Sequence, residues 1–443
     1  MRPPVGCPPA ERLAYRNKME FSFSSQVWQP GRGKGAIFSS SAGSRGGGSN
    51  GSTRGDAQRS SARAHSGGTG GGGFALGLHR PGSTSEVLPI SRCHLQPDAA
   101  NALLQRILTL CRQAGLRPFD PRTGQGLLQD VVLRRGTCSR LGGSSAPASS
   151  AAAGTAEPAE ADWLVNFVTA RDGRQALAPV AAALMQAAPP HGAAAVAAAE
   201  GSAGSAALPP APAVVGVVNS VSQRGRPVGE RRLAAEHVLA GWGTLTETLC
   251  GVEFEVSANS FFQTNTRQAE VLYRLVGEAA ALRPGDTLLD LYCGTGSIGL
   301  TLAHACAALY GVEVNPAAVR DAERNAARNG IANATFLQGD LQRLQLAGRL
   351  PQPDVVVVDP ARPGLSPLVI DYLRGCGARR VVYVSCNAAT QARDIRALCT
   401  STGGGGSGDG GAPFRLVSVQ AVDLYPQTHH VETIAVLDAV AAA

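Results

Sequence analysis

Short apolar runs alternate with helix-like stretches through the second half of the chain, and this pattern limits the possible folds more than any other feature. Strands that alternate with helices predict a parallel sheet with helices on both faces, a doubly wound, Rossmann-like α/β fold. The predicted strands are residues 286–291, 308–313, 334–338, 354–359, 380–386, 414–424 and 431–437. Ligands bind such a sheet at the carboxyl ends of its strands, so functional residues are expected there.

The first half of the chain has a different pattern. Residues 13–25 and 26–38 alternate in part between apolar and polar side chains, as strands do. Other patterns predict strands at residues 126–134, 163–169 and 214–221, and helices at residues 99–114 and 174–185. We therefore predict a central α+β domain over residues 1–245, followed by the doubly wound domain over residues 246–443.

Four stretches rich in Ala, Gly and Ser interrupt these two domains. They are approximately residues 39–73, 142–161, 186–212 and 401–412. Such compositions bury little apolar surface, so we predict flexible inserts within folded domains.

Charge and cysteine content narrow the class of protein. The net charge of +7 suits a polyanionic partner, although charge alone does not require one. The ten cysteines include no C-x-x-C pair and have irregular spacing, which favours reduced thiols in an intracellular compartment. The sequence has no apolar run of about 18 residues and no visible signal peptide, so no membrane span is predicted.

A glycine-rich loop, Gly294-x-Gly296-x-x-Gly299, follows the predicted strand 286–291. Glycines let the backbone approach a ligand closely, and Glu313 at the end of the next strand is placed to accept ribose hydroxyls. This arrangement suits a dinucleotide and S-adenosylmethionine about equally.

Two carboxylates favour S-adenosylmethionine at this loop. Asp290 precedes the glycines, where it would repel a pyrophosphate but tolerate a sulfonium group. Asp340, after the strand 334–338, is placed to accept from an adenine amino group. The alternative is that both side chains only cap turns.

Three further residues are expected at the same sheet edge. Cys386 at the tip of strand 380–386 is a nucleophile, a metal ligand or a packed thiol, and the polar Asn387 after it argues against packing. Asp359 ends strand 354–359, and Glu432 lies at the start of the last strand, where it is a candidate general base. His429 and His430 do not form a convincing metal site without a nearby cysteine pair.

Several segments together resemble the RNA uracil-5 methyltransferase family. They are Tyr15-Arg16-Asn17-Lys18-Met19-Glu20-Phe21, Ser260-Phe261-Phe262-Gln263-Thr264-Asn265, DLYCGTGSIGL from Asp290, Asp359-Pro360, SCNAATQARD from Ser385 and DLYPQTHHVE from Asp423. The resemblance covers nearly the whole chain outside the inserts. It implies a class I methyltransferase domain behind a central RNA-binding-type domain, and transfer of a methyl group from S-adenosylmethionine to C5 of a uridine in tRNA or rRNA.

The resemblance also implies roles for single residues. Cys386 would be the nucleophile that adds to uracil C6, and Glu432 the base that removes the C5 proton. The positions that match cofactor or pocket residues are Gln263, Tyr292, Ser297, Glu313, Asp340 and Asp359. RNA is the expected partner, the chain is expected to be a monomer, and no membrane contact or metal is expected.

The chain departs from the family pattern in several places. Ala388 replaces the proline usual after Ser-Cys-Asn, and Ser297 stands where some relatives carry Asn. The N-terminal RNA-binding β-barrel common in the family is expected to be absent. Some members of the family also hold a four-iron cluster, with three cysteines upstream of the central domain and one that matches Cys93. This chain has at most Cys7 and Cys93 for that purpose, so we predict no iron–sulfur cluster. The motifs look most like plant and algal organellar members, which suggests a plastid, with the cytoplasm and nucleus as alternatives.

Two other functions are compatible with parts of the sequence. A catalytically weak or inactive RNA-binding relative would share the fold, and Ala388 makes it plausible. A dinucleotide-dependent oxidoreductase would use the glycine-rich loop but would leave Cys386 and Glu432 without roles.

Overall fold

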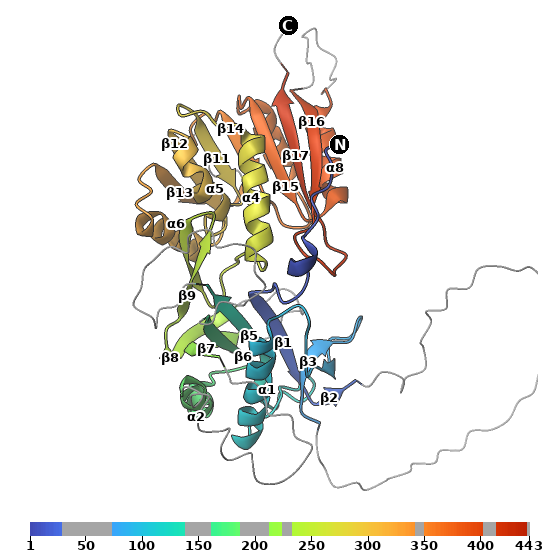
Figure 1. Cartoon of the computed structure of the whole chain (residues 1–443), viewed down its shortest axis with the longest axis vertical. Coiled ribbons are helices and arrows are strands. Elements are labelled where there is room, and N and C mark those ends of the chain that lie inside the picture. The colour runs from blue at the N-terminus through green and yellow to red at the C-terminus, as the bar shows by residue number, and fades with distance from the viewer. Residues whose placement is uncertain are drawn as a thin grey trace, which may run out of the picture.

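The computed structural model describes residues 1–28, 73–137, 161–186, 212–223, 233–341, 350–401 and 413–440. These residues form two large β-sheets, one at each end of the molecule and each with its own helices, and a two-stranded hairpin (Figure 1). The four predicted inserts lie almost entirely outside the described residues.

The C-terminal sheet has seven strands in the order β13-β12-β11-β14-β15-β17-β16. The strands are β11 Thr287–Leu291, β12 Ala308–Glu313, β13 Ala334–Gln338, β14 Val355–Val358, β15 Arg380–Ser385, β16 Phe414–Val422 and β17 Glu432–Ala439. β11 to β15 run parallel, whereas β17 is antiparallel to both of its neighbours. The strand order reverses between β11 and β14, which is the point where such sheets bind ligands. The doubly wound prediction is confirmed.

Helices cover both faces of this sheet. They are α4 Thr266–Ala280, α5 Ser297–Leu302, the short η2 Ala303–Ala305, α6 Pro316–Arg328, α7 Pro367–Gly375 and α8 Ala388–Cys399. α4, α5 and α6 share one apolar cluster with one face of the strands, and α7 and α8 share another with the opposite face. The four valines of β14 are fully buried, as a strand covered on both faces requires.

The N-terminal sheet has eight strands in the order β2-β4-β3-β1-β5-β6-β7-β8. They are β1 Lys18–Ser24, β2 Gln26–Val27, β3 Ala75–His79, β4 Glu86–Pro89, β5 Leu128–Gly136, β6 Asp162–Thr169, β7 Val214–Ser222 and β8 Leu233–Gly241. α1 Asp98–Gln113 and α2 Arg174–Met185 pack on this sheet in one cluster. An α+β arrangement was predicted, but β3, β4 and β8 were not.

A two-stranded hairpin joins the halves. It consists of β9 Thr244–Leu249 and β10 Val252–Ser257, which the sequence did not predict. Its buried residues Leu249, Phe254 and Val256 belong to the core of the C-terminal half. The hairpin therefore packs with the doubly wound sheet.

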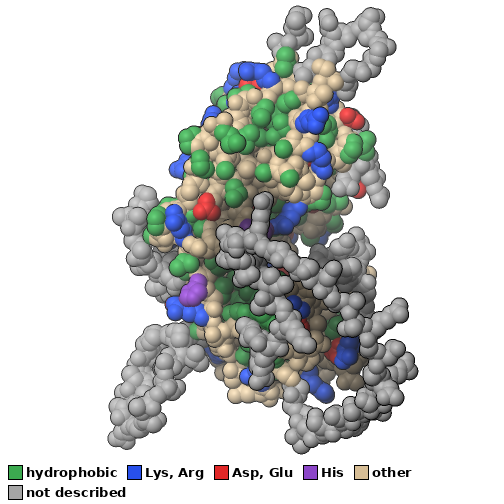
Figure 2. Space-filling model, turned by 90° about the vertical axis from the view of Figure 1, so that its right-hand side faces the viewer, with side chains coloured by type: hydrophobic (Ala, Val, Ile, Leu, Met, Phe, Trp, Pro, Cys, Tyr) green, Lys and Arg blue, Asp and Glu red, His purple; other side chains and the backbone are tan. Residues whose placement is uncertain are grey.

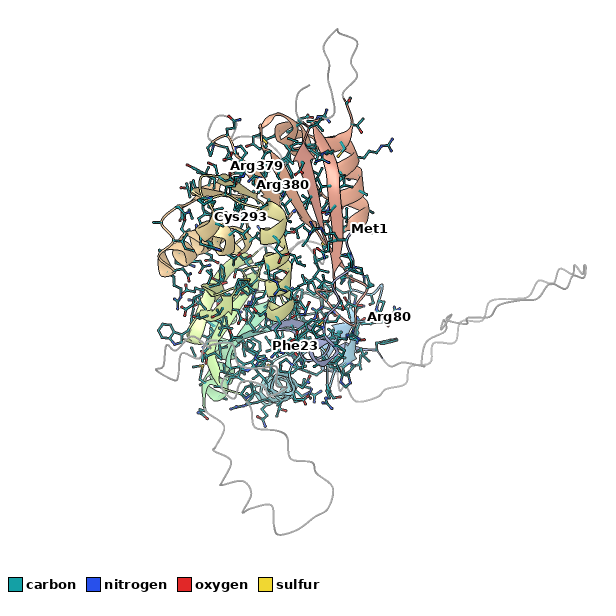
Figure 3. All side chains as sticks on the ribbon, turned by 45° about the horizontal axis from the view of Figure 1, so that its top comes forward. Met1, Phe23, Arg80, Cys293, Arg379 and Arg380 are labelled. Carbon is teal, nitrogen blue, oxygen red and sulfur yellow. The ribbon has the colours of Figure 1, made fainter. Side chains whose placement is uncertain are left out.

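The first residues of the chain also lie on the C-terminal sheet. The backbone N–H groups of Arg2 and Val5 donate to Val419 and Ala421 of β16, and Asp423 N–H donates to Val5. The N-terminus and Met1 lie near the last strands, whereas Phe23 and Arg80 lie in the other half (Figures 1 and 3). The chain therefore starts against one sheet before entering the other, and the domain boundary at residue 245 stays a prediction.

None of the helices in the described ranges combines the length and apolar character needed to cross a membrane.

Candidate active site

The glycine-rich loop connects β11 to α5 with a positive φ angle at three alternate residues. Tyr292, Gly294 and Gly296 have φ angles of 64°, 56° and 77°. A Cβ on Gly296 would lie 3.0 Å from the Phe336 ring, so both conformation and space favour glycine there. The loop thus presents backbone rather than side chains at the switch point of the sheet.

The carboxylate of Asp290, in β11, holds this loop through a hydrogen bond. Its Oδ2 accepts a hydrogen bond from Gly299 N–H at 2.9 Å, and its Oδ1 is buried without a hydrogen-bond partner among the described residues. Burial raises the pKa of Asp290 to about 8. The contacts of Asp290 therefore fit the alternative in which this carboxylate holds a turn.

Glu313 and Asp340 lie at neighbouring strand ends beside the loop. Glu313 Oε2 accepts from Gly294 N–H at 3.2 Å and Oε1 accepts from Asn315 N–H at 2.8 Å, so the carboxylate is fixed at the end of β12. Gly339 N–H donates to the Glu313 carbonyl, which ties the segment carrying Asp340 to the same edge. The predicted carboxylates are thus brought together with the glycine-rich loop.

Two tyrosines that the sequence did not single out contact the predicted pocket residues. The Tyr273 hydroxyl of α4 lies 2.8 Å from the Ser297 hydroxyl. Tyr425 donates to Gln263 Oε1 at 3.0 Å. Burial raises the pKa of both tyrosines, so both hydroxyls stay protonated. Tyr273 was missed because it lies in the apolar stripe of α4, where an aromatic residue is expected to be core.

Cys386, Glu432 and Asp359 come from three adjacent strands. In the antiparallel pair of β15 and β17, Ser385 faces Thr433, so Cys386 and Glu432 leave the sheet at the same end. Asp359 directly follows β14, the other neighbour of β15. The thiol and both carboxylates therefore converge as the strand pattern predicted.

The environment of the site raises the pKa values of its acidic side chains. Burial, and then the charge of Asp359, raises the pKa of Glu432 to about 8, against an opposing effect of Arg362. Burial raises the pKa of Asp359 to about 7. Burial followed by the charge of Glu432 also raises the pKa of the Cys386 thiol, which Arg362 counteracts. Acids with such pKa values can exchange protons near neutral pH.

The turn that presents Cys386 is fixed by hydrogen bonds. The Asn387 side chain accepts from Ala389 N–H and Thr390 N–H as the N-cap of α8, and Ser385 Oγ accepts from Asn387 N–H at 3.0 Å. Asn387 Nδ2 and the Thr390 hydroxyl both donate to the Arg362 carbonyl at 3.1 Å. The helix after the thiol and the loop after Asp359 are thereby joined, without the proline that Ala388 replaces.

Metal ligation is not supported by side-chain placement. The rings of His429 and His430 lie 4.0 Å apart, but among the described side chains no group of three or more His, Cys, Asp or Glu residues is placed to hold a metal ion. The absence of an iron–sulfur cluster stays a prediction.

Three comparisons with known proteins bear on this site. The family model for tRNA (uracil-5-)-methyltransferase matches residues 248–440. An uncharacterized RNA methyltransferase of Chlorobaculum tepidum is 33% identical over 368 residues, which are 82% of this chain and 64% of that protein. Another from Porphyromonas gingivalis is 31% identical over 369 residues, 82% of this chain and 67% of that protein.

One solved structure has the same overall fold. The crystal structure of the Pyrococcus abyssi tRNA (uracil-54, C5)-methyltransferase with S-adenosyl-L-homocysteine superposes with a TM-score of 0.61 at 21% identity. The match covers 98% of this chain and 78% of that one.

The sheet order and the loop at its switch point define a class I methyltransferase fold. Within that class, the chain belongs to the RNA methyltransferases, and its residues 248–440 match the tRNA (uracil-5-)-methyltransferase family. It spans about two thirds of the length of these curated relatives, 64% and 67% in the two cases above.

Proposed function

We propose that this protein methylates C5 of a uridine in RNA, with S-adenosylmethionine as methyl donor and Cys386 as nucleophile. The observation that carries the proposal is the convergence of Cys386, Asp359 and Glu432 at the ends of three adjacent strands. Substitution at uracil C5 needs a nucleophile and a base. Cys386 offers the thiol, and Glu432, whose pKa is about 8, offers the base.

Uracil C5 is a poor nucleophile, so the reaction begins at C6. The Cys386 thiolate forms a bond to C6, and the electron pair of the C5–C6 double bond moves into an enolate centred on C5 and O4. Enzyme-bound S-adenosylmethionine supplies an electrophilic methyl group for C5. Glu432 then takes the remaining C5 proton, the double bond re-forms and Cys386 leaves as thiolate.

The residues at the sheet edge fit S-adenosylmethionine. The loop from Tyr292 to Gly299 exposes backbone, and acceptors for hydroxyl and amino groups lie at the ends of β12 and β13 in Glu313 and Asp340. Gln263, Tyr292 and Ser297 would complete the cofactor site. A dinucleotide would use the same loop, but it would give Cys386 and Glu432 no task.

The substrate class follows from surface charge and from the depth of the site. Lys and Arg side chains lie on both halves of the face in Figure 2, where few acids are seen. Phe261 is 66% exposed two residues before Gln263 and is a candidate stacking surface, because a base must leave its helix to reach the half-buried Cys386 thiol. We propose tRNA or rRNA as substrate, a monomeric enzyme and a plastid location.

Tritium release from RNA that contains 5-tritiated uridine tests this function. Wild-type protein with S-adenosylmethionine should release tritium from unmodified tRNA or rRNA, because C5 exchanges its hydrogen for a methyl group. A non-catalytic RNA-binding relative or an oxidoreductase would release none. Full turnover by Cys386→Ala would contradict the proposed mechanism.

A further inference from the structure

Two arginines from different halves of the molecule lie near Tyr425 and His430 at the rim of this site. Arg16 precedes β1, and Arg362 lies in the loop after Asp359. An Arg362 guanidinium nitrogen lies 3.1 Å from His430 Nδ1. The His430 ring lies 6.3 Å from the Tyr425 ring, and the Arg16 guanidinium carbon lies 6.0 Å from the centre of that same ring.

Neither guanidinium lies within ion-pair distance of a described carboxylate, although the charge of Arg362 counteracts the burial that raises the pKa of Glu432 and of Cys386. Among the described residues, Arg16 and Arg362 form no ion pair with a carboxylate, although most other arginines near the surface of the C-terminal half do. Arg16 Nε is buried with no hydrogen-bond partner in the described part of the chain. A buried donor without a partner destabilises a protein by about 1–3 kcal/mol, so Arg16 Nε is a donor that a bound ligand can satisfy.

The acidic side chains of the site are more deeply buried than the basic ones. Glu432 is 5% exposed and lies with Asp359 at the floor, whereas the exposed Arg362, the half-buried Arg16 and His430 lie at the rim. The positive charges of Arg362 and Arg16 help to lower the pKa of His430, after burial and His429, so both arginines act on the same point. A ligand that matches this arrangement is neutral at its inner end and anionic at its outer end.

We propose that Arg16 and Arg362 together bind a backbone phosphate next to the target uridine while the uracil enters the floor of the site. The inference rests on the proposed function and specifies how its substrate is held. A nucleotide has a neutral base and an anionic phosphate, and arginine pairs with phosphate oxygens through two N–H groups. Because Arg16 and Arg362 come from different halves, the clamp is complete only when both halves are in place.

The carboxylate of the cofactor is the other anion to consider. The acceptors assigned to the cofactor, Glu313 and Asp340, lie at the ends of β12 and β13. Arg362 and His430 follow β14 and precede β17, on the opposite side of β11. This placement favours phosphate, and the experiment separates the two anions.

The first test compares Arg16→Gln and Arg362→Gln with wild type on an unmodified tRNA or rRNA transcript that the wild type methylates. Each variant should raise the KM for RNA about 10-fold, leave the KM for S-adenosylmethionine within about twofold, and reduce the slope of log KM against log salt by about 1. Arg16→Lys should recover part of the loss because it keeps the charge. Thermal unfolding shows whether each variant is folded.

Arg122→Gln is the matched control. Arg122 is exposed, forms an ion pair with Asp120, and lies in the loop in which Pro118 pairs with Leu128 at the start of β5. Arg134, near the other end of β5, faces Lys18, two residues after Arg16. Arg122→Gln should leave the KM for RNA and the salt slope unchanged. An equal effect of all three substitutions would show a general charge effect and overturn the clamp.

The second test removes the phosphate charge instead. A single uncharged methylphosphonate on the 5′ or 3′ side of the methylated uridine should raise the KM of wild type about 10-fold at one position and have little further effect on Arg16→Gln. Equal losses for both proteins, or a change only in the KM for S-adenosylmethionine, would contradict the inference. Failure of wild type to methylate any RNA would contradict the proposed function as well.

Discussion

Glu432 lies at the buried start of β17, beside Cys386 and Asp359, where its carboxylate has little water to stabilise a charge. Its pKa of about 8 follows mainly from that burial. A carboxylate tuned in this way is a stronger base once ionised than one in water. Proton removal by Glu432 is therefore the proposed step that its burial supports, at a residue that the sequence singled out by its position at a strand start and by the family resemblance.

Glu432→Gln should arrest the reaction after methyl transfer, because the amide cannot take the C5 proton. Turnover is expected to fall at least about 100-fold, the usual contribution of a general base. A covalent protein–RNA complex should accumulate and be visible by denaturing gel electrophoresis. Glu432→Gln with normal turnover would assign proton removal to another group.

Buried acids also make the stability of this protein depend on pH. The folded-state pKa values of Asp290 and Asp359, about 8 and about 7, lie above the unfolded value of about 4. The folded state therefore holds more protons, and the contribution of both groups, complete below about pH 4, is lost as pH rises toward 8. Unfolding temperature should fall from pH 5 to pH 8.

Asp290→Asn tests the origin of that dependence. The amide keeps an acceptor for Gly299 N–H but has no charge to bury, so the variant should be stabler than wild type at pH 8 by about 1 kcal/mol or more. At pH 5 the two proteins should differ less. Asp371→Asn, on an exposed position of α7, is the control and should follow wild type at every pH.

At the scale of elements, α8 and the loop after β14 act as one unit. Arg393 donates to the Pro363 carbonyl, and the buried Asp394 accepts from Leu365 N–H and from the Tyr383 hydroxyl. Together with the bonds to the Arg362 carbonyl, these contacts fix Cys386 relative to Asp359. The geometry of the site therefore depends on helix–loop contacts as well as on the strands.

Ala388→Pro restores the residue usual in the family and should be tolerated. Ala388 occupies the first helical position, where proline is favoured, and Asn387 before it is extended rather than helical, with φ −137° and ψ 94°, as is usual before proline. We expect a gain of about 0.5 kcal/mol in stability from reduced unfolded-state freedom, with kcat unchanged within about twofold. A large loss of activity would show that the turn needs alanine.

Strands were predictable from the sequence where both of their faces are buried, and helices where one clear apolar stripe is buried. β12, β13 and α2 have the predicted bounds because their apolar patterns end abruptly at polar or turn residues. β8 alternates between exposed and half-buried positions with several alanines, so its sequence carries no strong strand signal. The part of predicted strand 26–38 beyond residue 28 lies outside the described residues.

The site residues that lie at the ends of strands were predictable from the sequence. Cys386, Asp359, Glu432, Glu313 and Asp340 each follow or start an apolar run, and the sheet order brings them to one edge. Contacts between distant segments were not predictable. Tyr425 with Gln263 and Arg16 beside Tyr425 join positions far apart in the chain, and no local pattern encodes such pairs.

At the scale of the whole molecule, the segment before β1 connects the two halves at the site. Asn17 Nδ2 donates to the Gln263 carbonyl and to the Thr266 hydroxyl, both at 2.9 Å, and Asn17 N–H donates to Thr264. The Tyr15 hydroxyl donates to the Pro426 carbonyl at 3.0 Å. The N-terminal half thereby holds two loops of the site in position.

Asn17→Ala should weaken the site through this junction. Loss of two side-chain hydrogen bonds is expected to reduce stability by about 1–3 kcal/mol and to raise the KM for S-adenosylmethionine, because Gln263 loses its anchor. Asn333→Ala is the matched control. Its side chain also donates twice, to Ala303 and Cys306 carbonyls, but away from Gln263, so it should lower stability without changing KM.

RNA that carries 5-fluorouridine at the methylated position tests the central claim most directly. Fluorine at C5 cannot be removed as a proton, so the bond between Cys386 and C6 should persist after methyl transfer. Mass spectrometry of the digested complex should find one methyl group and the nucleotide on the peptide that contains Cys386, and Cys386→Ala should form no complex while Cys399→Ala still does. Methylation of ordinary RNA by wild type without any such adduct, or an adduct on a different cysteine, would contradict the account.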